Sequence, residues 1–133
     1  MIRVAAAVIE HEGRILIARR RPGVHLAGKW EFPGGKIEPG ETPEECLVRE
    51  LREEFSVETE VGPFLGSAVH EYPERVIELL AYRARYLSGE FVLSCHDEIR
   101  WVTPVQCRDF DFAEADLFIL EHLVRLAPNP GTL

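Results

Sequence analysis

Residues 34–57 read GGKIEPGETPEECLVRELREEFSV, and this stretch decides the fold. Thr42 is followed directly by Pro43 and, three positions after the threonine, by Glu45. A threonine and a glutamate at this spacing form a capping box, and proline favours the first position of a helix. We therefore expect a helix that begins at Pro43 and runs to about Phe55.

One face of the predicted helix is apolar. Leu47, Leu51 and Phe55 recur at four-residue intervals, so their side chains form a stripe that packs on the core. The glutamates of the helix must therefore point elsewhere.

Three of these glutamates share one face. Glu50, Glu53 and Glu54 stand at i, i+3 and i+4, which stacks their carboxylates above one another. Like charges so placed repel and cost stability unless a cation neutralises them. A local conflict of this kind is typical of a functional site, although a solvated charged face has the same spacing.

The acidic face has the chemistry of a magnesium site. Carboxylate oxygens are the ligands that Mg²⁺ prefers, and the ion keeps several waters and works with substrate phosphates. We expect Mg²⁺ here, with Mn²⁺ as an alternative, and a spare carboxylate acting as base toward water. A backbone carbonyl from the loop at Gly34 and Gly35 adds an oxygen, because glycine lets the backbone approach closely.

The composition bounds the kind of partner. The chain has 133 residues, which indicates one domain over 1–133. Hydrophobic residues make up 46% and charged residues 29%, the ordinary balance of a globular protein with its own core. The formal net charge is -8, and so acidic a chain is poorly suited to grip nucleic acid through phosphates. We therefore expect a small-molecule partner and no nucleic acid polymer.

The cysteines and the apolar runs indicate the compartment. Cys46, Cys95 and Cys107 are odd in number and far apart, which favours a reducing environment without a disulfide framework. The apolar part of the N-terminus is too short for a signal peptide, and no apolar run approaches membrane-spanning length. We expect a cytoplasmic protein without membrane contact, either a monomer or a homodimer.

Strands and helices alternate along the chain in the order strands, helix, strands, helix. This order favours an α/β fold, a mixed sheet with helices packed on it. The first two predicted strands form a hairpin around a turn at residues 11–13, and the tail over 128–133 is expected to be irregular. The predicted strands cover residues 2–10, 14–19, part of 60–72, 76–87 and 99–103, with a short strand or extended piece at 91–93, and the predicted helices cover 43–55, a short segment from 103, and 115–126.

The spacing of the central stretch resembles a known family pattern. From Gly35 to Val57 it runs Gly-x5-Glu-x7-Arg-Glu-Leu-x-Glu-Glu-x-x-Val, similar to the Nudix box GX5EX7REUXEEXGU, in which U is aliphatic. The match over 35–57 departs at one defined position, since Ser56 stands where the family has glycine. The resemblance implies the Nudix fold, an α/β/α sandwich, and overturns the solvated-face interpretation of the glutamates. Ser56 puts in question only the loop after the helix.

The resemblance extends beyond the box. Residues 18–45, ARRRPGVHLAGKWEFPGGKIEPGETPEE, are similar to the corresponding part of MutT-type Nudix hydrolases. Residues 70–79, HEYPERVIEL, look like the substrate hairpin of the same branch. Enzymes of this type hydrolyse a nucleoside triphosphate to the monophosphate and pyrophosphate, and the branch sanitises the nucleotide pool in support of DNA repair.

The same resemblance implies roles for individual residues. Arg49 orients a glutamate, Glu41 supports the site, and Arg20 contacts phosphates or sugar. The implied catalytic residues are Arg49, Glu50, Glu53 and Glu54. The implied metal ligands are the Gly34 carbonyl, Glu50, Glu53 and Glu54. The implied substrate-binding residues are Arg20, His25, Phe32, Lys36, Tyr72, Arg75, Ile77 and Asp116.

One acidic position of the family is missing from the chain. Many relatives have a glutamate six residues before the tryptophan of the late strand, where it binds metal or serves as base. Here Cys95 occupies that position, six residues before Trp101. We expect Glu98 to take its place as a metal ligand, with Asp97 as the alternative. The competing interpretation is a plain polar loop over 95–97.

Asp116 stands at the position that reads the base in the family. MutT itself has asparagine there, which both donates and accepts, whereas an ionised aspartate only accepts. Asp116 can accept from the exocyclic amine of cytosine or from guanine-type N–H groups. It also fits the N-cap of the last helix, and the two interpretations are compatible.

The preferred substrate is therefore a damaged or non-standard nucleoside triphosphate, with 8-oxo-dGTP first and CTP or a modified dCTP as the nearest rival. A dinucleotide or ADP-ribose hydrolase fits the short chain less well. A rival of another class is a non-catalytic Nudix module that senses nucleotides. Retention of all the box glutamates argues against that rival.

Overall fold

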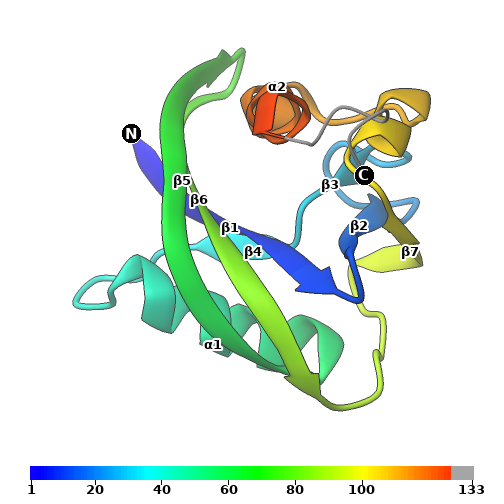
Figure 1. Cartoon of the computed structure of the whole chain (residues 1–133). Coiled ribbons are helices and arrows are strands. Elements are labelled where there is room, and N and C mark those ends of the chain that lie inside the picture. Colours follow the sequence, from blue (N-terminus) through cyan, green and yellow to red (C-terminus); the bar gives the residue numbers. More distant parts are fainter. Residues whose placement is uncertain (127–133) are drawn as a thin grey trace.

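The structure is a computed structural model that describes residues 1–126 (Figure 1), so the predicted irregular tail lies outside the described residues. Its α-helices are α1 (Pro43–Phe55) and α2 (Leu117–Leu126), and short 3-10 helices, η1 (Val105–Asp109) and η2 (Glu114–Asp116), precede α2. Its strands are β1 (Ile2–His11), β2 (Arg14–Arg20), β3 (Trp30–Glu31), β4 (Gly34–Lys36), β5 (Glu58–Tyr72), β6 (Arg75–Ser88) and β7 (His96–Val102).

The seven strands found within residues 1–126 form one mixed sheet, as the order of elements predicts. The main strand order is β3-β2-β1-β6-β5, with β4 paired to β1 and β7 paired to β2. β1 and β6 run parallel, from Ile2 opposite Ile77 to Glu10 opposite Arg85. β5 and β6 form a long antiparallel hairpin that closes at Tyr72.

The predicted hairpin of β1 and β2 is much shorter than expected. The two strands pair only beside their turn, where Glu10 lies opposite Ile15 and His11 opposite Arg14. Beyond that point they separate, and β4 pairs with β1 while β3 pairs with β2. The segment over 30–36 therefore fills the fork between the two strands, which carries its glycines to the helix α1.

The two helices cover opposite faces of the sheet (Figure 1), which confirms the predicted α/β/α sandwich. Leu47, Leu51 and Phe55 of α1 are fully buried in one hydrophobic cluster, as their spacing predicts. Ile119 and Leu123 of α2 are buried in the other cluster. Because β1 lies between these layers, its residues Ala5 to Ile9 are buried on both faces.

The boundaries of α1 follow the capping residues. The N–H of Glu45 donates to Thr42 Oγ1 at 3.1 Å and the N–H of Thr42 donates to Glu45 Oε1 at 2.9 Å. With Pro43 in the first turn, this is the predicted capping box. The helix ends at Ser56, whose φ of 60° and ψ of 32° are left-handed, and its N–H donates to the Arg52 carbonyl at 3.0 Å. Serine thus adopts the conformation for which the family uses glycine.

Several boundaries differ from the predictions because pairing overrides local pattern. β7 begins at His96 rather than 99, since its ladder with β2 continues to Arg20. Residues 91–93 form no strand. The last α-helix begins at Leu117, because residues 114–116 form a 3-10 turn ahead of it.

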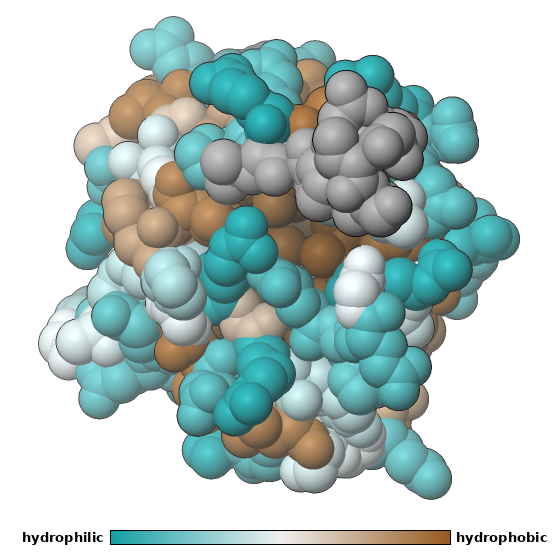
Figure 2. Space-filling view, in the orientation of Figure 1, coloured by the Kyte–Doolittle hydropathy of each residue, from teal (hydrophilic) through white to brown (hydrophobic). Residues whose placement is uncertain are grey.

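The surface mixes hydrophilic and apolar side chains. In the view of Figure 2, apolar side chains come to the surface in a band across the middle of the face. No helix within residues 1–126 is both long enough and apolar enough to span a membrane. The exposed large apolar side chains are Met1, Phe64, Val69, Leu87, Val92, Val105 and Leu117.

Candidate active site

The acidic face of α1 meets β4 at Gly35, and the adjacent Gly34 lies against β1. A β-carbon on Gly35 would come 2.3 Å from the carboxyl carbon of Glu50. A β-carbon on Gly34 would come 1.9 Å from the carbonyl oxygen of Ala5 on the neighbouring strand. Both positions therefore require glycine, one to allow the strand contact and the other to leave room for a carboxylate.

Arg49 ties the acidic side chains of this face together. Its Nε and Nη2 donate to the two carboxylate oxygens of Glu41 at 2.7 and 2.9 Å. Its Nη1 donates to Glu50 Oε1 at 2.8 Å and to Glu53 Oε2 at 3.2 Å. Nη2 also donates to the carbonyl of Lys36 at 3.2 Å, which links α1 to β4. One guanidinium thus fixes the positions of three carboxylates relative to the glycine segment.

Glu41 is a permanently charged support for Arg49. The hydrogen bonds from Arg49 lower the pKa of Glu41 to about 2, and the N–H of Glu38 adds to this effect. The same pairing raises the pKa of Arg49 above its usual value. Both groups therefore keep their charges at any pH near neutrality, and the support does not change with protonation.

Glu54 lies in a different environment on the same face. Its side chain is half-buried, and burial raises its pKa to about 7, with the carboxylate of Glu50 as the next contributor. Two neighbouring carboxylates in a poorly solvated place disfavour a second negative charge. A divalent cation bound between them removes that penalty, because it compensates both charges.

The donor set of this face fits Mg²⁺ or Mn²⁺. Within residues 1–126 no three histidine, cysteine or acidic side chains already stand together as a metal cage. Arg49 occupies the space between Glu50, which is 13% exposed, and Glu53, which is 61% exposed. All the donors are carboxylate or carbonyl oxygens, the kind that hard divalent ions take while keeping several waters. Glu50, Glu53 and Glu54, with the carbonyl of Gly34, are the residues that would hold such an ion.

A cleft runs from this acidic face across the fork. It consists of two adjoining hollows of about 190 and 220 Å³ that share Val4, Arg20, Glu31, Leu79 and Asp116. The first hollow ends at the two glycines and Lys36, next to α1. All eight predicted substrate-binding residues line one or both hollows, namely Arg20, His25, Phe32, Lys36, Tyr72, Arg75, Ile77 and Asp116.

Asp116 lies on the wall of both hollows. It is 6% exposed, and its Oδ2 accepts the N–H of Phe32 at 2.8 Å. Asp116 directly precedes α2, at the position of an N-cap, and its carboxylate accepts from the fork segment. Burial raises the pKa of Asp116 well above its usual value, and the nearby Glu31 carboxylate adds to this.

The hairpin of β5 and β6 contributes the far wall of the cleft. The hydroxyl of Tyr72 accepts the N–H of Ala115 at 3.1 Å, which ties the hairpin to the start of η2 and α2. The ring of His25 meets the edge of the Tyr72 ring, with 6.2 Å between centroids. Arg75 and Ile77 line the same hollow. Three segments that lie far apart in sequence therefore converge on one cavity.

Two residues of this region were not predicted from the sequence. Glu31 lies in the fork, where its Oε2 accepts from Arg20 Nη1 at 3.0 Å and lies 2.7 Å from His96 Nε2. Trp30 and Phe32 pack in the cluster under α2, so strand alternation turns Glu31 to the other side. The alternation of Trp30, Glu31 and Phe32 could have predicted the direction of the Glu31 side chain from the sequence. Nothing in the sequence around His96 indicated that Glu31 is its partner.

Glu98 does not join the acidic face of α1. Arg100 Nε donates to its Oε2 at 2.6 Å, and Arg19 Nη1 lies 3.5 Å from its Oε1. Along β7, Ile99 packs in the cluster with α1, while Val102 packs in the cluster on the α2 side. Glu98 shares its side of the strand with Val102, so its carboxylate faces away from α1. Glu98 is therefore not part of the proposed metal site.

The alternative residues of that loop do not replace it. Asp97 accepts from Arg19 Nε at 2.8 Å, and this contact lowers the pKa of Asp97 below its usual value. The carbonyl of Cys95 accepts the N–H of Arg21 at 3.0 Å. The polar-loop interpretation of 95–97 also fails at His96, which is buried and begins β7.

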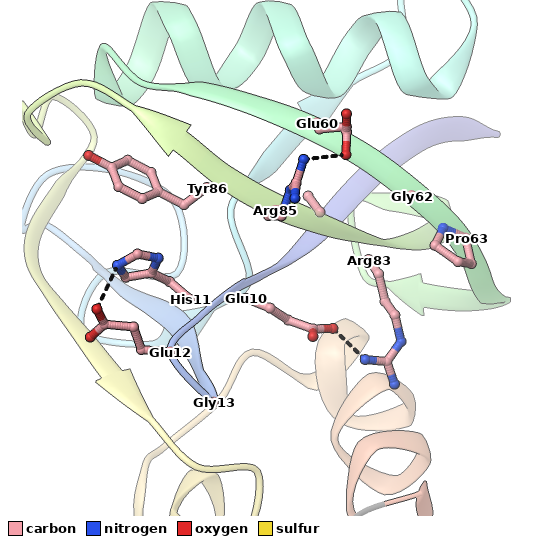
Figure 3. A pocket seen from close by; sticks show the side chains of 11 residues that line it. Glu10, His11, Glu12, Gly13, Glu60, Gly62, Pro63, Arg83, Arg85 and Tyr86 are labelled. Carbon is pink, nitrogen blue, oxygen red and sulfur yellow. Dashed lines mark hydrogen bonds and ion pairs between the residues drawn. The ribbon is translucent and has the colours of Figure 1, made fainter.

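A separate hollow of about 490 Å³ lies near the turn of β1 and β2 (Figure 3). Its two arginines are already paired, Arg83 with Glu10 and Arg85 with Glu60, the latter at 3.0 Å. His11 Nε2 lies 3.7 Å from a Glu12 carboxylate oxygen. This hollow therefore presents paired charges rather than a cation that is free for phosphate.

Comparison with known proteins assigns the family. A family model described as NUDIX domain matches residues 4–122. The chain belongs to the Nudix family. It is 40% identical to a CTP pyrophosphohydrolase of Escherichia coli (strain K12), over 95% of this chain and 93% of that protein. It is 35% identical to an 8-oxo-dGTP diphosphatase of the same organism, over 94% and 98%. Among solved structures, a MutT protein from Methanosarcina mazei Go1 matches with a TM-score of 0.83 and 29% identity, covering 93% of each chain.

Membership of the Nudix family confirms the resemblance drawn from residues 35–57. It also confirms the predicted enzyme class, because the curated Nudix relatives are named as pyrophosphohydrolases and diphosphatases. The Nudix box accordingly corresponds here to β4, the loop to α1, α1 itself and its C-terminal cap.

Proposed function

We propose that this Nudix hydrolase is a nucleoside triphosphate pyrophosphohydrolase that releases a nucleoside monophosphate and pyrophosphate and depends on Mg²⁺, with Mn²⁺ as a substitute. The observation that carries the proposal is the position of the cleft. Its glycine end abuts Glu50 on α1, its other end is lined by Tyr72, and Asp116 lines both hollows between them. A nucleotide lying along it has its phosphates at the glutamates and its base at Asp116.

Different residues along this cleft have different proposed roles. Arg49 holds Glu50 and Glu53 so that their carboxylates face one place. Glu54, whose pKa is raised, is the group on this face best suited to take a proton from an attacking water. When bound, the divalent cation supplies electrostatic stabilisation of the charge that develops on the phosphoryl oxygens. Arg20 supplies a cation beside the phosphates or sugar.

The first candidate base is oxidised guanine, as in 8-oxo-dGTP. Asp116 and Glu31 both line the cleft with carboxylate oxygens, which accept hydrogen bonds when ionised. A guanine base carries N–H donors at N1 and N2, and oxidation at C8 adds a third at N7. A base with several donors therefore suits a cleft with two acceptor groups, and such a substrate belongs to sanitising of the nucleotide pool.

CTP, or a modified dCTP, is the second candidate substrate. The relative at 40% identity is named a CTP pyrophosphohydrolase. Asp116 can also accept the exocyclic amine of cytosine, a pairing that aspartate makes with this base elsewhere. One buried carboxylate is enough to recognise this single donor group.

The decisive experiment is a panel of pyrophosphate-release assays. It contains 8-oxo-dGTP, dGTP, CTP, dCTP and 5-methyl-dCTP, each with Mg²⁺, with Mn²⁺ and with EDTA. ADP-ribose is tested under the same conditions by the AMP that its hydrolysis releases, because it yields no pyrophosphate. We expect pyrophosphate from the triphosphates, highest kcat/KM for 8-oxo-dGTP, and loss of turnover in EDTA. Highest kcat/KM for CTP selects the second candidate. A panel that is inactive throughout contradicts the proposal and favours a non-catalytic nucleotide-sensing module.

A further inference from the structure

His96 occupies a buried position that packing alone does not explain. Its side chain is 1% exposed, and its ring stacks on that of Phe55, with centroids 5.1 Å apart and 22° between the planes. Its Nδ1 is buried without a hydrogen-bond partner in the part of the chain that the structure describes. An unsatisfied buried polar atom is destabilising, so an apolar side chain would stabilise the core more at this position.

The other ring nitrogen has a specific partner. Nε2 of His96 lies 2.7 Å from Oε2 of Glu31, and because a carboxylate accepts, Nε2 carries the proton. The same Oε2 accepts from Arg20 Nη1 at 3.0 Å. Arg20 in turn donates from Nε to the carbonyl of His25. The imidazole thus stands at the closed end of a chain of hydrogen bonds that leads into the cleft.

This chain of contacts joins the acidic helix to the substrate cleft. Phe55, on which His96 stacks, is the last residue of α1. Arg20 and Glu31 line both hollows, beside the glycine segment at one end and His25 at the other. Both side chains remain partly accessible, whereas His96 does not touch the cleft. Holding the side chains of Glu31 and Arg20 in one geometry costs conformational entropy. The hydrogen bond from the buried His96 to Glu31 offsets part of that cost.

We propose that His96 is a positioning residue for the cleft: it fixes the carboxylate of Glu31, and through it the guanidinium of Arg20, for binding of the nucleotide. The inference rests on the proposed function and deepens it, since it assigns a task to a residue outside the Nudix box. His96 acts on substrate binding rather than on the reacting phosphorus, because Arg20 and Glu31 line the binding cleft.

The first test separates the hydrogen bond from the packing. His96→Leu keeps an apolar side chain against Phe55 but removes the donor, whereas His96→Gln retains an N–H that reaches Glu31. We expect His96→Leu to raise KM for the preferred nucleotide about tenfold, the effect of losing one hydrogen bond to a charged group, with kcat within about threefold. His96→Gln is expected to restore KM to within about threefold. Equal loss in both variants, or a fall in kcat alone, overturns the inference.

A double mutant tests whether His96 acts through Glu31. In a Glu31→Gln background, His96→Leu is expected to raise KM by less than about twofold further, because the contact it removes is already weakened. If the two effects multiply, His96 acts independently of Glu31 and the inference is wrong. Melting temperatures of all variants, measured by circular dichroism, check that each is folded.

A measurement without nucleotide or cation distinguishes this inference from the proposed function. In nitrogen-15 NMR of the imidazoles, His96 is expected as the Nε2–H tautomer, and Glu31→Gln is expected to shift its Nε2 signal. An unshifted signal overturns the inference even in an active enzyme. If the signal shifts but no nucleotide is hydrolysed, the proposed function fails alone. Calorimetric affinities for the same nucleotides then replace KM in comparing the two His96 variants, and equal affinities overturn the inference.

Discussion

Gly35 backs directly onto the carboxylate of Glu50, so closely that a β-carbon would lie 2.3 Å from the carboxyl carbon. In this contact the fork segment contributes only the backbone of Gly35, and α1 contributes the side chain of Glu50. Glycine is therefore required at position 35 because a larger residue would displace the Glu50 carboxylate, and not because the chain turns there.

Gly35→Ala is expected to lower kcat/KM by about 100-fold, because the new methyl group displaces the Glu50 carboxylate by about an ångström. Gly62→Ala is the matched control, since its nearest neighbour would be 3.6 Å away, and it is expected to keep full activity. Steady-state assays on the preferred nucleotide check both. Full activity in Gly35→Ala would show that Glu50 need not hold this position.

Glu53→Gln and Glu54→Gln are each expected to lower turnover by roughly 10²–10³-fold, because each removes a charge from the proposed cation site. The fold should survive, since Glu53 is exposed and a neutral amide relieves repulsion at Glu54. Glu44→Gln, in the first turn of the same helix, serves as control. Near-normal Mg²⁺-dependent hydrolysis in either site variant contradicts the assignment.

Asp116→Asn is expected to change the ratio of kcat/KM between 8-oxo-dGTP and CTP by about tenfold, because the amide always presents an N–H donor, whereas the carboxyl group donates only when it is protonated. The amide oxygen can still accept the N–H of Phe32, which preserves the wall of the cleft. Asp111→Asn, an exposed residue paired with Lys29, controls for the change of charge. An equal loss for all nucleotides would mean that Asp116 does not read the base.

Ser56→Gly is expected to raise the free energy of unfolding by about 0.5–1 kcal/mol, because glycine adopts the left-handed cap without the strain that serine bears. Ser67→Gly, within the extended strand β5, is expected to lower it by about the same amount. Chemical denaturation of the two variants checks the opposite signs. Destabilisation by Ser56→Gly would indicate that the serine side chain stabilises the cap.

Glu41→Gln is expected to reduce stability in a pH-dependent way. The folded pKa of Glu41 is about 2, below its ordinary value of 4.5, so its stabilising contribution is complete above pH 4.5 and is lost as pH falls toward 2. The difference in unfolding free energy between wild type and variant should therefore shrink over that window. A difference that stays constant from pH 5 to pH 2.5 contradicts the ion pair as its source.

Local pattern was enough for much of the fold. The helix that was predicted from Pro43 to about Phe55 is observed over Pro43–Phe55, because the capping box and the apolar stripe both depend on residues that are close together in the sequence. The box spacing from Gly35 to Val57 indicated the family, and the eight residues that the resemblance predicts to bind substrate line one cleft.

What local pattern missed depends on pairing between distant strands. A register shift in the ladder of β7 with β2, between the Arg19–Glu98 and Arg20–His96 pairs, lets His96 stack on Phe55 at the end of α1 while Glu98 faces the opposite side of the sheet. The opening of the β1–β2 fork brings Glu31 between Arg20 and His96. Neither arrangement can be predicted from the residues that flank it in the sequence, because register is a property of two strands together.

The acidic helix, its caps, the glycines beside it and the family could thus be predicted from the amino-acid sequence, because all of them rest on spacings of a few residues. Which carboxylates lie near one another could be learned only from the folded chain, because strand register and the fork set distances between residues that are more than 60 positions apart, such as Glu31 and His96. For this reason the sequence wrongly predicted Glu98 as a site residue and did not predict Glu31.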